Sequence, residues 1–192
     1  MDIVPDAKDW TWVLQRACPD CGFDAAAVAG PDVAAMLRGA AQTWQIRLRR
    51  DDVGTRPARQ TWSPLEYACH VRDVCSRFDD RLALMLTQAD PEFGNWDQDA
   101  TAITDRYGEQ NPAEVAVELG RAADTLAAHF AEVRDDQWQR SGRRSDGARF
   151  TVDSFARYLL HDILHHLHDV GAGVPADARG SDPVQRGVTP SA

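Results

Sequence analysis

The sequence has no long apolar run and a single lysine. No apolar stretch approaches the roughly 18 residues that a membrane-spanning helix needs, and the N-terminus lacks the basic start and apolar segment of a secretory signal. Both absences predict a cytoplasmic protein that does not enter a membrane. Lys8 stands beside twenty arginines and an abundance of alanine, a bias that suggests a GC-rich genome as the source.

A large cluster of basic residues is also missing. The net charge is -9 at pH 7, and the two short arginine clusters, at residues 47–50 and 140–144, have acidic residues close by. Nucleic-acid binding depends on clustered Lys and Arg that neutralise phosphates. The composition therefore predicts that the protein does not bind nucleic acid.

The sequence gives no strand signal, because no run of β-branched and aromatic residues alternates with period two between turn pairs. What is present instead is apolar spacing of three and four residues, which is typical of amphipathic helices. It occurs in four segments, at residues 32–49, 64–87, 112–134 and 151–170. We therefore expect an all-α fold, a four-helix bundle.

Capping residues mark several of the helix ends. Ser63 precedes Pro64 and is followed three residues later by Glu66, the pattern of a capping box. Asn111 can cap the third helix, and Gly171 is a natural stop for the fourth.

The 192 residues suffice for one domain with extensions at its ends. Residues 1–30 carry tryptophans and a phenylalanine, so we expect them to pack along a bundle formed by residues 31–171. Residues 172–192 are rich in Gly, Pro, Ala and Asp and are expected to form a disordered tail. The long link at 88–110 permits a crossover, so that the second and third helices run parallel.

Histidines concentrate in the last predicted helix. His161 and His165 are four residues apart, which places two imidazoles side by side on a helix. His70 lies about 10 Å into the second helix, and His165 lies about 9 Å before the end of the last, at 1.5 Å per residue. If these helices are antiparallel, His70, His161 and His165 can hold one divalent metal, since neutral imidazole suits zinc, nickel, copper or iron.

Other interpretations of these histidines stay open. Asp162 and His166 have the same spacing as His161 and His165, and His168 lies one turn from His165. His161 and His165 also lie beyond the edge of the aliphatic face of their helix. A pair of histidines with this spacing can equally be satisfied core or surface residues.

Four cysteines have no evident partner in a metal site. Cys18 and Cys21 form half of a zinc knuckle, but the required second pair is missing, because Cys69 and Cys75 are six apart on a helix. A redox Cys-x-x-Cys needs a βαβ setting that the sequence does not show. A packed loop with ordinary thiols is the favoured interpretation, with metal or redox chemistry as the alternative.

Residues from about 32 to 171 resemble the DinB-like superfamily of metal-binding four-helix bundles. The resemblance rests on His70 early in the second helix and on the pair His161 and His165 late in the last. In the mycothiol-dependent maleylpyruvate isomerases of this group, the first residue of that pair is Glu. With His161 in that place, the chain resembles a three-histidine branch.

The resemblance implies an up-down-down-up bundle with a long crossover between helices two and three. It also implies a divalent metal, with zinc favoured over nickel or iron, and a small thiol such as mycothiol as cosubstrate for an electrophile. Three protein ligands leave one position of the metal open, and Asp73, Asp162 and Asp169 are candidates to orient the imidazoles. The expected activity is thiol transfer or isomerisation; the alternative is a non-catalytic, metal-stabilised stress-response or binding module, which could be a homodimer.

Overall fold

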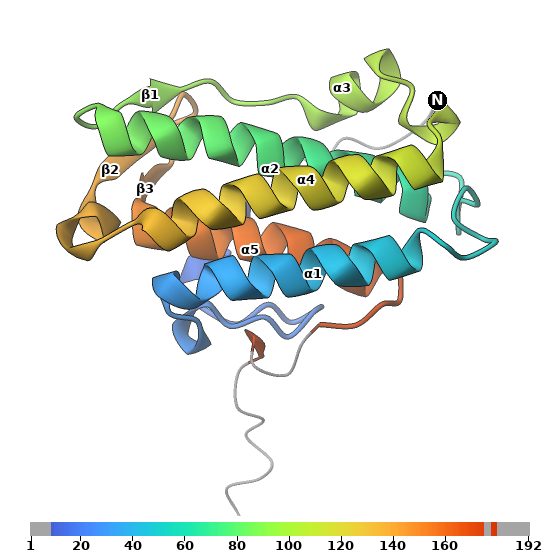
Figure 1. The fold of residues 1–192 in the computed structure, drawn as a ribbon, viewed down its shortest axis with the longest axis horizontal. Helices are drawn as coiled ribbons and strands as arrows, with labels where there is room; N and C mark the ends of the chain where they lie inside the picture. Colours follow the sequence, from blue (N-terminus) through green and yellow to red (C-terminus); the bar gives the residue numbers. More distant parts are fainter. Residues whose placement is uncertain (1–8, 175–177, 180–192) are drawn as a thin grey trace, which may run out of the picture.

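The computed structural model describes residues 9–174 and 178–179 and is mostly helical. Four long helices form the body of the molecule, and one short helix lies in the crossover (Figure 1). The helices of the described residues are α1 (Val33–Arg47), α2 (Pro64–Thr87), α3 (Gln98–Thr104), α4 (Pro112–Glu132) and α5 (Val152–Asp169).

The four long helices pack in the cyclic order α1, α4, α2, α5, since α1 and α2 each contact both α4 and α5. In Figure 1, α2 and α4 run from right to left, whereas α1 and α5 run from left to right. The neighbours α2 and α5 are therefore antiparallel. This sense brings the start of α2 beside the end of α5, where the histidines lie.

Both helices of this pair begin with a capping box. Ser63 accepts a hydrogen bond from the Glu66 backbone N–H, and the Glu66 carboxylate accepts one from the Ser63 N–H. Thr151 and Ser154 form the equivalent arrangement at the start of α5. These caps satisfy backbone donors that a helix start leaves unpaired, and they fix where each helix begins.

Three short strands correct the expectation of a purely helical protein. They are β1 (Glu92–Phe93), β2 (Ser141–Arg144) and β3 (Arg149–Thr151). β2 pairs parallel with β1 and antiparallel with β3. With two to four residues each, the strands are too short to show a period-two pattern in the sequence.

The crossover between α2 and α4 is more structured than the sequence indicates. It contains β1, α3 and a 3-10 helix at Tyr107–Glu109. Tyr107 is buried, and its hydroxyl donates a hydrogen bond to Asp73 on α2. The crossover is thereby held against the bundle along its length.

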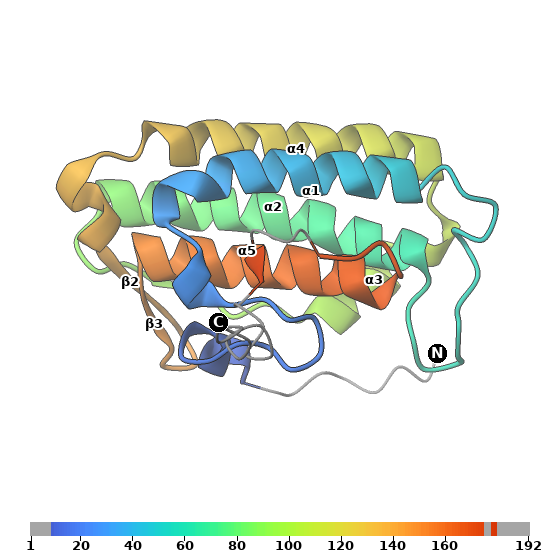
Figure 2. The same cartoon turned by 90° about the horizontal axis from the view of Figure 1, so that it is seen from below.

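The N-terminal segment packs beneath α5 (Figure 2). It consists of turns and three 3-10 helices, at Trp10–Leu14, Ala25–Ala27 and Gly30–Asp32. Val13 is fully buried, and Phe23 is fully buried in the same core as the bundle. The segment is therefore part of the folded domain.

The expected disordered tail lies largely outside the described residues, at 175–177 and 180–192. Within the described part, Ala178 is buried, and its carbonyl accepts a hydrogen bond from the Asp24 N–H. A β-bridge also joins Phe23 to Arg179. These two residues of the expected tail therefore pack against the N-terminal segment.

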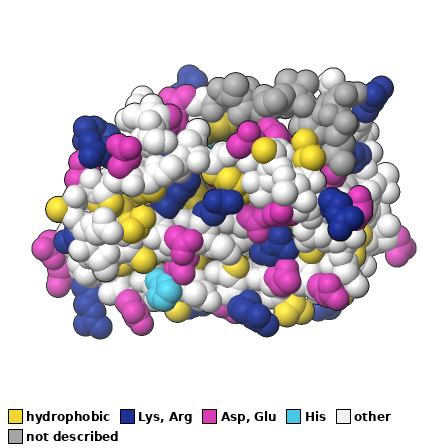
Figure 3. All heavy atoms as spheres, turned by 90° about the horizontal axis from the view of Figure 1, so that it is seen from above, with side chains coloured by type: hydrophobic (Ala, Val, Ile, Leu, Met, Phe, Trp, Pro, Cys, Tyr) yellow, Lys and Arg dark blue, Asp and Glu magenta, His cyan; other side chains and the backbone are white. Residues whose placement is uncertain are grey.

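None of the described helices combines the length and the apolar character that crossing a membrane would require. Figure 3 shows the face of the molecule on which the crossover lies. Acidic and basic side chains are interspersed on it. No patch of one charge sign dominates this face.

Glu66 generates a prediction about stability. Burial raises the pKa of Glu66, but hydrogen bonds from Arg56 and Ser63 outweigh it and hold the pKa below its usual value. The ionised carboxylate therefore stabilises the fold above the unfolded-state pKa of about 4.3, and this stabilisation is lost as the pH falls through the folded-state pKa. We expect Glu66→Gln to lower the free energy of unfolding by about 1–3 kcal/mol at pH 7.

Urea denaturation of parent and variant at pH 7 and pH 3 measures this difference, which should shrink at the lower pH. The exposed carboxylate of Glu132, at the end of α4, provides the control variant Glu132→Gln. An equal loss at both pH values would contradict the electrostatic explanation.

Candidate functional site

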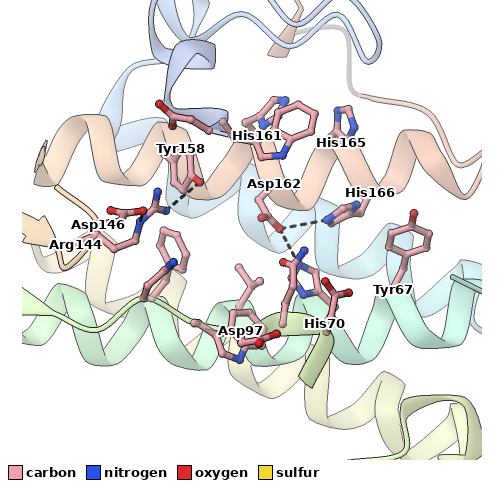
Figure 4. Close-up of a pocket in the computed structure, with 18 of the residues that line it drawn as sticks. Tyr67, His70, Asp97, Arg144, Asp146, Tyr158, His161, Asp162, His165 and His166 are labelled. Carbon is pink, nitrogen blue, oxygen red and sulfur yellow. Dashed lines mark hydrogen bonds and ion pairs between the residues drawn. The ribbon is translucent and has the colours of Figure 1, made fainter. Parts of the chain in front are cut away.

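A pocket of about 850 Å³ lies between α2, α5 and the crossover segment that contains Asp97 (Figure 4). Its volume is within the usual range for small-molecule sites, about 300–1,000 Å³. Aromatic residues, histidines and carboxylates line it together. The histidine side chains predicted from the sequence lie at this pocket, but they divide into two groups.

His70 occupies the α2 side of the first group. It is 1% exposed, and neither ring nitrogen forms a hydrogen bond within the described residues. Its ring stacks on Trp96 at a centroid distance of 5.3 Å and also contacts Trp62. A buried imidazole without hydrogen bonds is costly, so the ring is suited to bind a metal or another ligand beside its ion-pair partner Asp162.

Asp162 reaches toward His70 from α5. Its Oδ1 atom lies 3.4 Å from His70 Nε2 and 3.7 Å from His166 Nε2. Burial raises the pKa of Asp162, but the neighbouring imidazoles of His70 and His166 outweigh it and hold the pKa at about 2. The group is therefore a carboxylate at neutral pH.

His166 lies one turn further along α5, on the same face as Asp162. Its Nδ1 is 2.9 Å from Asp169 Oδ2, and an ionised carboxylate can only accept a hydrogen bond. The proton of a neutral His166 ring is therefore on Nδ1, which leaves the Nε2 lone pair directed toward Asp162 and His70. Metal-bound histidines are commonly oriented in this way.

The spacing of this group fits a metal ion. One ligand atom from each of His70, Asp162 and His166 lies within 4.8 Å of the other two. Two ligands of a tetrahedral zinc, each about 2.0–2.2 Å from the metal, are about 3.4 Å apart. The observed separations of 3.4 and 3.7 Å are close to that value. Two imidazoles and one carboxylate are also a donor set that zinc and iron accept.

His161 and His165 face away from this group. Figure 4 shows both side chains on the side of α5 opposite to His70. They form a second group with Cys18 and Cys21, in which the ligand atoms lie within 4.8 Å of one another. The structure thus does not bring His70, His161 and His165 together, because adjacent helix positions differ by about 100° in direction.

The pair that faces His70 is the alternative, Asp162 with His166. The sequence favoured His161 and His165 over this pair, which has the same spacing on the helix. The two pairs differ by one position in the sequence and therefore lie about 100° apart around the axis of α5. The sequence alone does not say which pair faces α2. That choice is made by the packing of α5 against α2.

Burial governs the protonation of the second group. Desolvation and, after it, the neighbouring His165 lower the pKa of His161 to about 4. Desolvation also lowers the pKa of His165, although Asp169 opposes this. Both rings are neutral at pH 7, as metal ligation requires.

The other residues that the sequence suggested near the histidines, Asp73, Asp169 and His168, differ in their contacts. Asp73 is bound to Arg72 and to the Tyr107 hydroxyl, so it orients no histidine of either group. Asp169 contacts histidines of both groups, as expected for a residue that orients ligands. His168 is about half exposed.

Two arginines, Arg81 and Arg144, line the pocket beside Asp146. Arg144 is bound to Asp146 and to the Tyr158 hydroxyl. Arg81 donates to the Gly94 carbonyl and lies over Phe78 and Phe93. Burial, together with Arg144 and Arg77, lowers the pKa of Arg81 to about 10, so an anion bound beside it would be stabilised.

Residues 33–170 match the model of the DinB superfamily. The chain belongs to this superfamily. The fold also resembles a solved structure of YfiT from Bacillus subtilis, described as a probable metal-dependent hydrolase with an unusual four-helix bundle topology. The two chains are 17% identical, with a TM-score of 0.65 over 74% of this chain and 85% of the other. Among curated proteins, none matches the sequence.

The sequence-based prediction of DinB-like membership is thus confirmed, and so is a mostly helical fold with a bundle relative. Sequence reasoning missed that His161 and His165 lie beside Cys18 and Cys21. The signal was present, since His161 and His165 have the His-x3-His spacing that accompanies Cys-x2-Cys in zinc sites. About 140 intervening residues concealed it.

Cys69 and Cys75 generate a prediction about reactivity. Both are fully buried on α2, and burial raises the pKa of Cys69 to about 12 and that of Cys75 as well. Because the thiolate is the reactive form, we expect neither to react with a disulfide reagent in the native protein at pH 8. The variant Cys18→Ser/Cys21→Ser isolates these two thiols. Thiol titration before and after denaturation should give none and then both; rapid reaction of the native variant would contradict this.

Proposed function

We propose that the protein is a metal-dependent enzyme of the DinB superfamily, with His70, Asp162 and His166 as ligands of a divalent metal. Zinc is favoured, with nickel and iron as alternatives. The convergence of His70 Nε2, Asp162 Oδ1 and His166 Nε2 at the pocket carries this proposal. His70 was among the ligands predicted from the sequence, whereas Asp162 and His166 replace His161 and His165.

The reaction we propose is transfer or isomerisation that uses a small thiol such as mycothiol. A carboxylate between two histidines agrees with the pattern expected of the isomerase branch, in which an acidic residue begins the helical pair. A bound metal supplies Lewis acidity that favours the thiolate form of a sulfur ligand. In this reaction the S–H bond of the thiol breaks, its proton goes to solvent and a C–S bond forms. The electrophile then either expels a leaving group with its bonding electrons or, where sulfur adds to a carbon–carbon double bond, takes up a proton from solvent at the neighbouring carbon.

The protein contributes positioning and desolvation. Asp169 fixes the ring of His166, and the tryptophans beside His70 exclude water from it. Polar side chains at the pocket, including Asn95, Asp97 and Gln98, offer hydrogen bonds to a thiol that carries hydroxyl groups. Arg81 offers a charge for a carboxylate on the electrophile.

Metal content and activity test the proposal on the same preparations. We expect Asp162→Asn and His166→Ala to lose one equivalent of metal per chain by mass spectrometry, because each removes one of three ligands. The exposed His129, which pairs with Asp79, provides the control His129→Ala. Untagged protein is required, since a histidine tag binds metal itself.

Metal-loaded parent protein should accelerate conjugation or isomerisation of an electrophile with mycothiol or cysteine, and Asp162→Asn should not. Hydrolysis of esters or amides without any thiol would instead favour the activity ascribed to YfiT. Loss of thermal stability on chelation, with neither chemistry, would favour the non-catalytic module. Unchanged metal content in both ligand variants would refute the site.

The position of Arg81 at the pocket generates a prediction about the charge of the substrate. We expect Arg81→Met to raise KM for a carboxylate-bearing electrophile about tenfold to hundredfold, because a charge-assisted hydrogen bond contributes about 1.5–3 kcal/mol. Arg81→Lys should restore part of the loss, and the amide analogue of the electrophile should show little change. Equal effects on the acid and the amide would exclude a role in charge recognition.

A further inference from the structure

The second group of side chains joins two parts of the molecule that are distant in the sequence. Cys18 and Cys21 lie in the N-terminal segment, and His161 and His165 lie on α5. We propose that these four residues form a second metal site, a closed Cys2His2 zinc centre that fastens the N-terminal segment to the bundle. This centre is separate from the ligands His70, Asp162 and His166.

The N-terminal half of the site is shaped as a knuckle. The Gly22 N–H donates to the Cys18 carbonyl at 2.9 Å, and the Cys18 N–H donates to the Phe23 carbonyl at 2.8 Å. Gly22 has a φ of 76°, which a residue with a side chain adopts at a cost. This turn brings two thiols, three residues apart in the sequence, to one side of the loop.

The separations match tetrahedral zinc. Cys18 Sγ lies 3.7 Å from His165 Nδ1, and one ligand atom from each of the four residues lies within 4.8 Å of the others. A zinc ion with Zn–S of about 2.3 Å and Zn–N of about 2.0–2.1 Å places such a sulfur and nitrogen about 3.6 Å apart. The two cysteines and two histidines also have the C-x2-C and H-x3-H spacings of zinc sites.

One nitrogen in this group lacks a partner. His161 is 3% exposed, and its Nε2 forms no hydrogen bond within the described residues. His165 is turned so that Nε2 faces Asp169 Oδ1 at 3.7 Å and Nδ1 faces Cys18. An S–H···N hydrogen bond explains the Cys18–His165 contact alone, whereas a metal satisfies all four residues.

The surroundings are those of a structural centre. Cys18 and Cys21 are buried, and the ring of Trp10 lies 5.6 Å from His161 and 5.1 Å from His165 between centroids. Four protein ligands leave no open position, which is typical of structural zinc. The first group, with three ligands at the pocket, has the opposite character.

The closed centre also stabilises the wall of the pocket. Trp10, His161 and His165 line the pocket together with His70 and His166, and Asp169 contacts the imidazoles of His165 and His166. Zinc in the closed centre therefore fixes the helix face that carries the open one. Loss of the closed centre should loosen residues 9–30 while leaving the ligands of the open centre present.

The test separates this proposal from the proposed function. Untagged parent protein should hold two zinc ions per chain, Cys18→Ser/Cys21→Ser one, Asp162→Asn one, and the combined variant none. Cobalt substitution should give thiolate-to-metal charge-transfer absorption in the parent and in Asp162→Asn, but none in the cysteine variant. Zinc lost only with Asp162→Asn would overturn the closed centre and leave the open one standing; zinc lost only with the cysteines would do the reverse.

Two measurements keep the test decisive if the cysteine variant does not fold. X-ray absorption of the zinc-loaded Asp162→Asn protein should show two sulfur ligands at about 2.3 Å; nitrogen and oxygen ligands alone would refute the proposal. Mass spectrometry after alkylation should find both thiols free once zinc is removed. A Cys18–Cys21 disulfide in freshly purified parent protein would establish a redox pair in place of the metal centre.

Discussion

The carboxylate of Asp162, held between the imidazoles of His70 and His166, is the interaction on which the functional architecture depends. It places one buried charge between α2 and α5, at the end of the bundle where the pocket lies. A buried charge is tolerated when it is paired or bound to a metal. The antiparallel packing of α2 and α5 is what makes this arrangement possible, since it brings an early residue of one helix beside a late residue of the other.

The α5 helix contributes to two groups of side chains because neighbouring positions on a helix point about 100° apart. Asp162 and His166 face α2, and His161 and His165 face the N-terminal segment. Each group therefore has two members on α5: Asp162 and His166 join His70 of α2, and His161 and His165 join Cys18 and Cys21. Asp169 follows both sets and contacts a histidine of each, so the orientation of one set affects that of the other.

The residues around the two groups are of two kinds, aromatic rings and polar or charged side chains. Aromatic rings cover His70 and His161 and keep water from their nitrogens. Polar and charged groups at the pocket, among them Arg81 and Asp97, remain available to a small molecule. The result is a dry group of imidazoles beside a polar cavity.

By itself, the sequence determined the helices and the residue types that carry the chemistry. Apolar periodicity, the Ser63 capping box and the spacing of His161 and His165 are local features, so the chain order reveals them. The short strands were missed because they are too short for a period, and the grouping of the ligands was missed because it depends on rotation about the axis of α5. Only the tertiary structure decided that rotation, since it follows from which apolar side chains α2 and the N-terminal segment bury against α5.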